Sequence, residues 1–240
     1  MRTVTLSGWG QPHDALSRLA PGSVAIDYAH ASNAAEAIRM IASLAGKAER
    51  VIGWSLGGQL AVRAVAEGAI APKQLVLIAT PYQFVADGWG RDTFDKFFAN
   101  YKTNPRRTLH KAWDLLHYED AQSDYIRDQL AAFDKDAVLA KDWLRWLSIL
   151  EHFSCDTLDF AHFPPTMLVH GAKDVVVPPE NSQRMAARLP AARRELWEGC
   201  GHAPHLHDAP PALPFFLLLS PLASSIRALF RAHGPHDLRH

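Results

Sequence analysis

The chain has 240 residues, of which 48% are hydrophobic, and a formal net charge of +0 at pH 7. This length suits one α/β domain with a substantial core and an inserted subdomain. The balanced charge gives no reason to expect a nucleic acid or a membrane surface as a partner. The two cysteines form neither a disulfide framework nor a metal motif, and no stretch resembles a signal peptide. We therefore expect no metal site and a cytoplasmic location.

Apolar runs alternate with helical patterns along much of the chain. Strands are expected over 4–6, 23–28, 50–52, 74–79, 166–170 and 193–197. Helices are expected over 33–45 and 59–66, as one or two turns over 14–19, from 209 onward and over 224–232. Strands that alternate with helices predict a mostly parallel sheet with helices on both faces.

One section breaks this alternation. Between 82 and 163 there is no strong strand pattern, and apolar residues recur at helical spacing in four sets, over 94–101, 109–116, 126–133 and 139–150. We interpret this section as a four-helix lid inserted into a core formed by 1–81 and 164–240. A lid of this kind shapes the substrate pocket and excludes water.

The stretch around Ser55 carries the strongest chemical signal. Ser55 stands between Gly53 and Gly57 in the pattern G-x-S-x-G, after an apolar strand and before a helical run. Glycines at these positions let strand and helix approach closely around a sharp turn, which lifts the serine hydroxyl clear of the sheet. The helix N-terminus beside it favours negative charge. We interpret Ser55 as a nucleophile rather than as an incidental turn residue.

A serine needs a base and a group that orients the base. Asp174 and His202 each follow a predicted strand, and the order serine, aspartate, histidine is the one expected of this architecture. His205 and His207 are competing candidates for the base, and Asp87 is the alternative acid.

The chemistry also needs donors for a developing oxyanion. The backbone N–H of Leu56, directly after the nucleophile, is one, and the N–H of Trp9 in the turn after the first strand is the other. Trp9, Trp54 and Tyr82 are expected to contact the substrate. No cofactor is required.

Four motifs in the right order resemble the α/β-hydrolases over nearly the whole chain: Gly53-Trp54-Ser55-Leu56-Gly57-Gly58, Gly8-Trp9-Gly10, His170-Gly171-Ala172-Lys173-Asp174 and Gly201-His202-Ala203-Pro204. They are similar above all to the BioH-type carboxylesterases, the pimeloyl-acyl-carrier-protein methyl ester esterases of biotin synthesis. The resemblance implies an α/β-hydrolase fold and a serine carboxylesterase that acts through an acyl-enzyme.

The same resemblance implies that Ser55 is the nucleophile, His202 the base and acid, and Asp174 the orienting group. It also implies a small-molecule or carrier-protein-tethered ester as substrate and an acyl carrier protein as partner. That partner would contact basic lid residues, for which Arg106, Arg107 and Lys111 are the local match.

Three other functions stay open. A thioesterase or lipid-ester hydrolase would use the same three residues, and a binding protein of the same fold would have no need of them. Cofactor-free haloperoxidase chemistry is the third, whereas a dehalogenase would need an aspartate at position 55.

Overall fold

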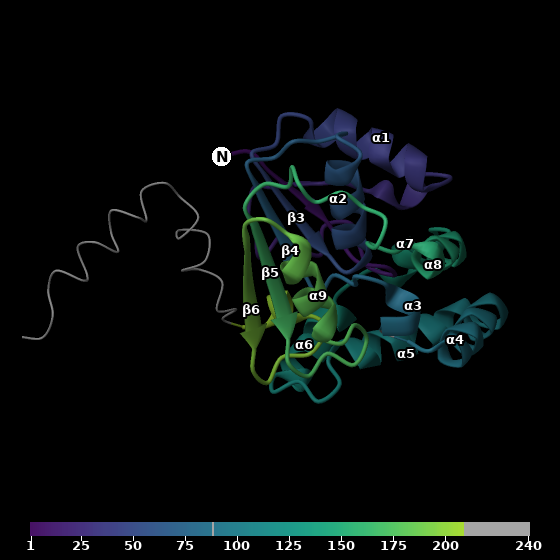
Figure 1. Ribbon diagram of the computed structural model, residues 1–240. Coiled ribbons are helices and arrows are strands. Elements are labelled where there is room, and N and C mark those ends of the chain that lie inside the picture. The colour runs from purple at the N-terminus through teal and green to yellow at the C-terminus, as the bar shows by residue number, and fades with distance from the viewer. Residues whose placement is uncertain (88, 209–240) are drawn as a thin grey trace, which may run out of the picture. The chain divides into compact units, whose positions relative to one another are not determined.

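A single parallel sheet forms the centre of the protein. The computed structural model describes residues 1–87 and 89–208 (Figure 1). The strands of this part of the chain are β1 (Thr3–Leu6), β2 (Val24–Ala25), β3 (Arg50–Trp54), β4 (Gln74–Ile78), β5 (Thr166–Gly171) and β6 (Ala192–Trp197). Their order in the sheet is β2-β1-β3-β4-β5-β6, and every neighbouring pair is parallel. The predicted parallel α/β sheet is thus confirmed.

The three central strands lie entirely in the core. Every residue of β3, β4 and β5 is buried, which accounts for their continuous apolar runs. The edge strand β6 contains only half-buried and exposed residues, and it carries charged side chains. Because parallel strands end at the same edge, the loops after β1, β3, β5 and β6 are brought to one end of the sheet.

Helices α1 (Ala34–Ala45), α2 (Leu56–Ala66) and α9 (Glu180–Arg188) connect or cover these strands. Asn33 caps the N-terminus of α1, since its side chain accepts the Glu36 N–H at 2.9 Å. Helix α2 packs on β1 and β3, and α9 packs on β5 and β6. The sequence reading had not predicted α9.

The predicted lid section is helical. Between β4 and β5 lie α3 (Phe84–Asp87), α4 (Arg91–Thr103), α5 (Pro105–Leu116), α6 (Ser123–Ala131), α7 (Lys135–Leu139) and α8 (Trp143–His152). Figure 1 shows α4, α5, α7 and α8 on the right of the view and α6 at the bottom, below the sheet. The four predicted sets correspond to α4, α5, α6 and the α7–α8 pair. Met1–His207 forms one compact unit, and the division into core and lid at 82 and 163 stays a prediction.

One local expectation was wrong, and two lie outside the described residues. Residues 14–19 form hydrogen-bonded turns, in agreement with the one or two turns expected there. The strand expected over 23–28 has only two residues, and the 3₁₀ helix η1 (Tyr28–His30) follows, in which the Tyr28 hydroxyl donates to Ser7 O at 2.6 Å. The helices expected after 209 fall outside the described part. Within the described part, no helix has the length and apolarity needed to span a bilayer.

Gly57 permits the closest contact between α2 and the sheet. A Cβ atom at this position would lie 2.3 Å from Leu6 O and 2.4 Å from Ser7 O, both of which are backbone atoms at the end of β1. Backbone atoms in the core cannot move away as a flexible side chain can. A side chain here would therefore push α2 away from β1.

We predict that Gly57→Ala destabilises the fold by about 1–3 kcal/mol, the usual cost of overpacking. Denaturant unfolding measures this loss. Gly90→Ala is the matched control, because a Cβ at Gly90 has no heavy atom within 4 Å. Equal stability of the two variants would contradict the prediction.

Candidate active site

Ser55 occupies a strained turn between β3 and α2. Its φ of 54° and ψ of −121° are unusual for a residue with a side chain, and such a backbone conformation costs about 1–3 kcal/mol. Its N–H donates to Ile78 O at 2.9 Å, and its carbonyl accepts the Gln59 N–H at 3.1 Å. These bonds to β4 and α2 hold the turn, and strain that the surroundings maintain is a feature of functional sites.

Asp174 lies in the loop after β5 and is saturated with hydrogen bonds. One carboxylate oxygen accepts the backbone N–H groups of Val176 at 2.9 Å and Val177 at 2.8 Å. The other lies 2.7 Å from His202 Nδ1 and 3.2 Å from His170 Nε2. The side chain is thus fixed in position, with one oxygen directed at the imidazole of His202.

The surroundings of Asp174 keep it ionised. Its burial alone would raise the pKa of the carboxyl, but the charge of His202 and the hydrogen bonds from His170 and His202 lower that pKa to about 2. The carboxylate therefore accepts from His202 Nδ1, which must carry a proton. In a neutral ring this leaves Nε2 free to accept a proton.

His202 is held from both sides of its backbone. Its carbonyl accepts the indole N–H of Trp54 at 2.9 Å, and its own N–H donates to Leu116 O at the end of α5 at 3.1 Å. The loops of the acid and the base also pack together, because a Cβ at Gly171 would lie 2.1 Å from Gly201 O. The structure thus brings together the three residues that the sequence singles out.

Ser55 and His202 line the same inner cavity, of about 50 Å³. The polar side chains of the lining are those of Gln11, Ser55 and His202. The other lining residues are aromatic or aliphatic: Trp9, Phe84, Trp89, Phe97, Ala112, Trp113, Leu115, Leu116, Leu147, Leu150 and Val176. A cavity with this lining suits an apolar group placed beside one serine and one histidine.

The inner cavity borders a larger surface groove of about 700 Å³. Trp89, Phe97 and Leu115 line both spaces. Helices α4 and α5 supply most of the groove lining, which includes the side chains of Lys96 and Lys111. A ligand too long for the inner cavity could therefore extend past Trp89, Phe97 and Leu115 into the groove.

The two competing histidines have different surroundings. His205 packs edge-to-face against the ring of Trp54 with centroids 4.3 Å apart, and burial lowers its pKa to about 3, with a further contribution from the charges of His202 and His207. Such a weak base holds no proton at neutral pH. The side chain of Asp87, the alternative acid, is not described.

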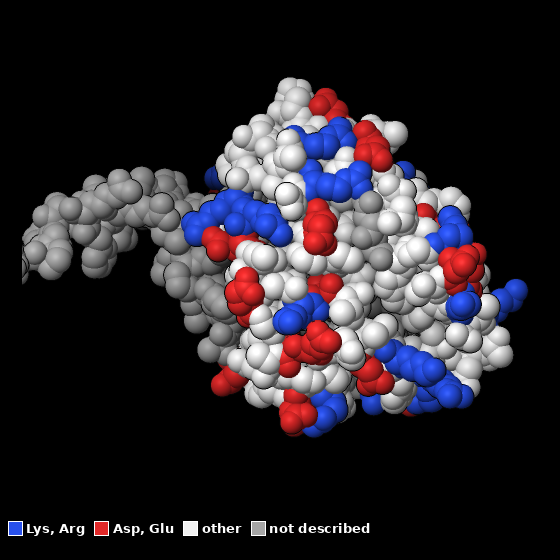
Figure 2. All heavy atoms as spheres, turned by 60° about the horizontal axis from the view of Figure 1, so that its bottom comes forward, with Lys and Arg blue, Asp and Glu red and all other residues white. Residues whose placement is uncertain are grey.

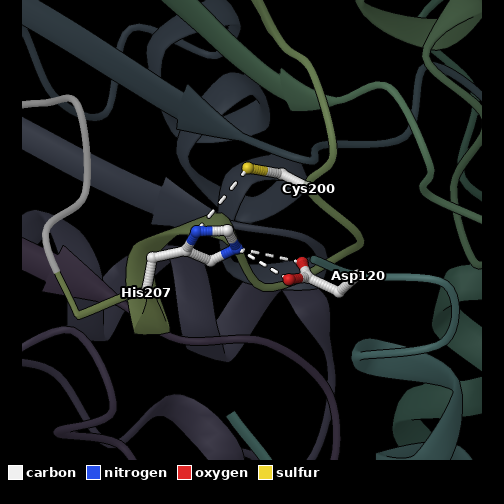
Figure 3. Close-up of side chains that lie close together, drawn as sticks. All are labelled: Asp120, Cys200 and His207. Carbon is white, nitrogen blue, oxygen red and sulfur yellow. Dashed lines mark hydrogen bonds and ion pairs between the residues drawn. The ribbon is translucent and has the colours of Figure 1, made fainter. Parts of the chain in front are cut away.

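His207 forms a buried cluster with Asp120 and Cys200 (Figure 3). Its Nε2 lies 3.0 Å from the Asp120 carboxylate, and its Nδ1 lies 3.9 Å from Cys200 Sγ. Burial alone would lower the pKa of His207, but the hydrogen bonds to Asp120 and Cys200 raise it to about 9. An imidazole that is protonated at neutral pH cannot act as a base there.

The expected oxyanion donors lie in suitable elements. Leu56 is the first residue of α2, so its N–H has no acceptor within that helix. The Gly8–Trp9 turn lies against the serine, since a Cβ at Gly8 would be 3.4 Å from Ser55 Cβ. Trp9 also lines the inner cavity, and its indole N–H donates to Trp143 O at 2.8 Å.

The other two expected substrate contacts lie elsewhere. Trp54 is buried behind His202 and does not line the inner cavity among the described residues. Tyr82 is also absent from that lining. Its hydroxyl bonds Asp156 at 2.9 Å and accepts from Arg188 at 2.8 Å. Neither ring lines the inner cavity, and their contact with the substrate stays a prediction.

Sequence reasoning missed three residues at or near the site. His170 bonds Asp174, and its position at the end of a predicted strand, four residues before the acid, was an available signal. Gln11 lines the cavity with an Oε1 that is buried without a partner among the described residues. Asp120, between α5 and α6, binds the loop of His202, and no local pattern marks it.

The comparisons with known proteins define the class. Residues 3–213 match the model of the alpha/beta hydrolase family. Solved structures with the same fold include a bromoperoxidase from Bacillus anthracis, with a TM-score of 0.76, 15% identity and 91% of each chain covered. An esterase from Exiguobacterium antarcticum has a TM-score of 0.67 and 14% identity, over 96% of this chain and 92% of that one. The chain belongs to the alpha/beta hydrolase family.

Several curated relatives are named as esterases. A pimeloyl-[acyl-carrier protein] methyl ester esterase from Nitrosomonas europaea is 33% identical over 172 residues, which span 65% of each protein. The protein of the same name from Xanthomonas campestris pv. campestris is 29% identical over 217 residues, or 87% of this chain and 79% of that one. The resemblance to this group of esterases is thus confirmed.

We predict that the Asp120–His207 pair makes the stability of the fold depend on pH. A folded-state pKa of about 9 means that the stabilisation is full below pH 6.5, the ordinary value for histidine, and is lost as pH rises to 9. The difference in unfolding free energy between wild type and His207→Gln, from urea titrations, should be larger at pH 6 than at pH 9.5. A difference that does not change with pH would contradict this sign.

Proposed function

We propose that the protein is a carboxylic ester hydrolase in which Ser55 is the nucleophile, His202 the general base and acid, and Asp174 the residue that orients His202. The observation that carries this proposal is that Ser55 and His202 line one cavity while His202 Nδ1 is bonded to the buried Asp174 carboxylate. The names of the relatives from Nitrosomonas europaea and Xanthomonas campestris pv. campestris, both esterases, support the same activity.

In the first half of the reaction, Nε2 of His202 takes the proton of the Ser55 hydroxyl while Oγ attacks the ester carbonyl carbon. Asp174 stabilises the imidazolium that forms. The tetrahedral intermediate collapses, His202 returns the proton to the leaving alcohol oxygen, and the acyl group stays on Oγ.

In the second half, water replaces the alcohol. His202 takes a proton from the water as it attacks the acyl carbon, and the same proton returns to Ser55 Oγ when the acid leaves. The backbone N–H groups of Trp9 and Leu56 would bind the oxyanion in both halves, an interaction worth about 10²–10³-fold in rate per donor.

The shape of the site supports a small end group on a longer chain. The inner cavity of about 50 Å³ has room for a group such as a methyl ester, and the largely apolar groove that it borders also carries Lys96, Lys111 and Asp114. A methyl ester on a chain tethered to an acyl carrier protein fits this arrangement, and the names of the relatives support it. The chain would lie in the groove and the carrier outside it.

The basic residues named from the sequence have different positions. Lys111 lines the groove together with Lys96, and among the ion pairs of the described residues neither lysine takes part. Arg106 is paired with Asp136 instead. Figure 2 shows acidic and basic side chains interspersed over the face it presents. An acidic carrier would thus bind by a few local contacts, of which Lys96 and Lys111 are the best placed.

The test of the proposed function is hydrolysis of short p-nitrophenyl esters. We predict that Ser55→Ala abolishes turnover and that Asp174→Asn lowers kcat on the order of 10⁴-fold, as in other serine hydrolases. Ser148→Ala, outside the inner cavity, is the control.

Three results would contradict this assignment. Faster cleavage of the matching thioesters than of oxyesters would favour the thioesterase. Tight ligand binding without turnover of any ester would favour the binding protein. Near-normal rates for Asp174→Asn would mean that another acid orients His202.

We also predict that the double variant Lys96→Glu/Lys111→Glu raises KM about tenfold or more for a methyl ester tethered to acyl carrier protein, because each reversal replaces an attraction by a repulsion. Kinetics on a free p-nitrophenyl ester should stay within about twofold. The double reversal Lys47→Glu/Lys102→Glu keeps the net charge equal and serves as control. Equal effects of both double variants would assign the change to overall charge.

A further inference from the structure

The connection between α5 and α6 is hydrogen-bonded to the loop that carries His202. The carboxylate of Asp120 in this connection accepts the Gly201 N–H at 2.6 Å. On either side of that bond, Leu116 O accepts the His202 N–H at 3.1 Å and Gly199 O accepts the Ala121 N–H at 2.8 Å. Three hydrogen bonds thus join residues 116–121 to residues 199–202.

A buried ion pair closes the loop at its far end. His207 lies five residues after His202, and its Nε2 is 3.0 Å from both oxygens of Asp120. As Figure 3 shows, the ring of His207 lies between the carboxylate and the thiol of Cys200. One side chain, Asp120, therefore binds the loop both before and after the base.

Both oxygens of the Asp120 carboxylate have hydrogen-bond partners. Besides Gly201 and His207 it accepts the Gln122 N–H at 2.7 Å, and it is 6% exposed. Removing one partner of such a buried pair is strongly unfavourable, because the other charge is left unpaired. Glu119, the residue before Asp120, has a φ of 54°. The backbone thus has an unfavourable conformation next to the buried side chain of Asp120.

The same helix forms the wall of the inner cavity. Ala112, Trp113, Leu115 and Leu116 of α5 line it, and the indole N–H of Trp113 donates to Gly10 O at 2.9 Å, next to the expected oxyanion donor. Helix α5 therefore contacts the acyl group, the oxyanion turn and, through its C-terminal end, the loop of the base.

We propose that Asp120 is a positioning residue for His202, which, with His207, fixes the base to the helix that lines the acyl cavity. The proposal rests on the proposed function, in which His202 is the base. Misplacement of a reacting group by about 1 Å can cost on the order of 10²-fold in rate, so this link contributes to kcat rather than to substrate binding.

Asp120, Cys200 and His207 could also hold a metal ion, since their ligand atoms lie within 4.8 Å of one another. The arrangement favours the positioning role. The thiol and the carboxylate face different nitrogens of His207, so one ion could not use the ring together with both in this geometry. Two backbone N–H groups already occupy the carboxylate oxygens.

The experiment compares wild type, Asp120→Asn, His207→Gln and the control Asp124→Asn, an exposed aspartate in the first turn of α6. A fluorophosphonate that labels Ser55 counts the competent sites in each preparation. We expect Asp120→Asn to lower kcat per labelled site about 10–100-fold on a short p-nitrophenyl ester, with KM within twofold. Labelling should become slower but still reach one equivalent. Asp124→Asn should match wild type.

His207→Gln keeps the bond between Asp120 and Gly201, so its kcat should fall less than that of Asp120→Asn. It also provides the test if Asp120→Asn does not fold. The proposal is overturned if Asp120→Asn retains wild-type kcat per site, or if its loss lies wholly in the number of sites that label. It is equally overturned if the purified protein holds one equivalent of zinc whose removal lowers kcat as the variant does.

Assays of wild type and Ser55→Ala distinguish a failure of this proposal from a failure of the proposed function. If wild type hydrolyses no ester, the proposed function fails. If wild type is active and Ser55→Ala is not, a failure of the Asp120 variants concerns the positioning role alone.

Discussion

The close approach of α2 to the sheet is the constraint on which the site depends. It requires hydrogen atoms in place of side chains at Gly53 and Gly57, where a Cβ would lie 2.5 Å from Gly58 Cα and 2.3 Å from Leu6 O. This packing holds Ser55 at a φ of 54° against the intrinsic preference of its backbone. Packing of the rest of the core compensates for this strain. The conformation of Ser55 therefore depends on the whole sheet and not only on the turn that contains it.

The charges of the site are set by what surrounds each group. Asp174 remains ionised because two backbone N–H groups and two histidines bind it. Three neighbouring histidines differ for the same reason. His202 faces the acid and the cavity, His205 is buried neutral against Trp54, and His207 is kept protonated by Asp120. Residue type alone does not distinguish them, whereas the partners of each ring do.

Helix α5 and the connection that follows it contact several parts of the candidate site. The helix lines the inner cavity and bonds the turn of Gly10, and Asp120 in the connection binds the loop after β6. Leu116, the last residue of α5, accepts the His202 N–H. The same segment of the chain therefore forms part of the cavity wall and holds the backbone of Gly201 and His202.

The parallel sheet, the turn at Ser55 and the candidates Asp174 and His202 could be predicted from the sequence. These depend on short-range patterns: apolar runs of strand length, glycines two residues from a serine, and polar groups directly after strands. Other features become visible only in the folded chain: Trp54 bonds the His202 carbonyl, Tyr82 bonds Asp156 and Arg188, and Asp120 reaches across 81 residues to Gly201. A contact between distant segments leaves no periodicity in either segment, because it is created when the two surfaces are packed together.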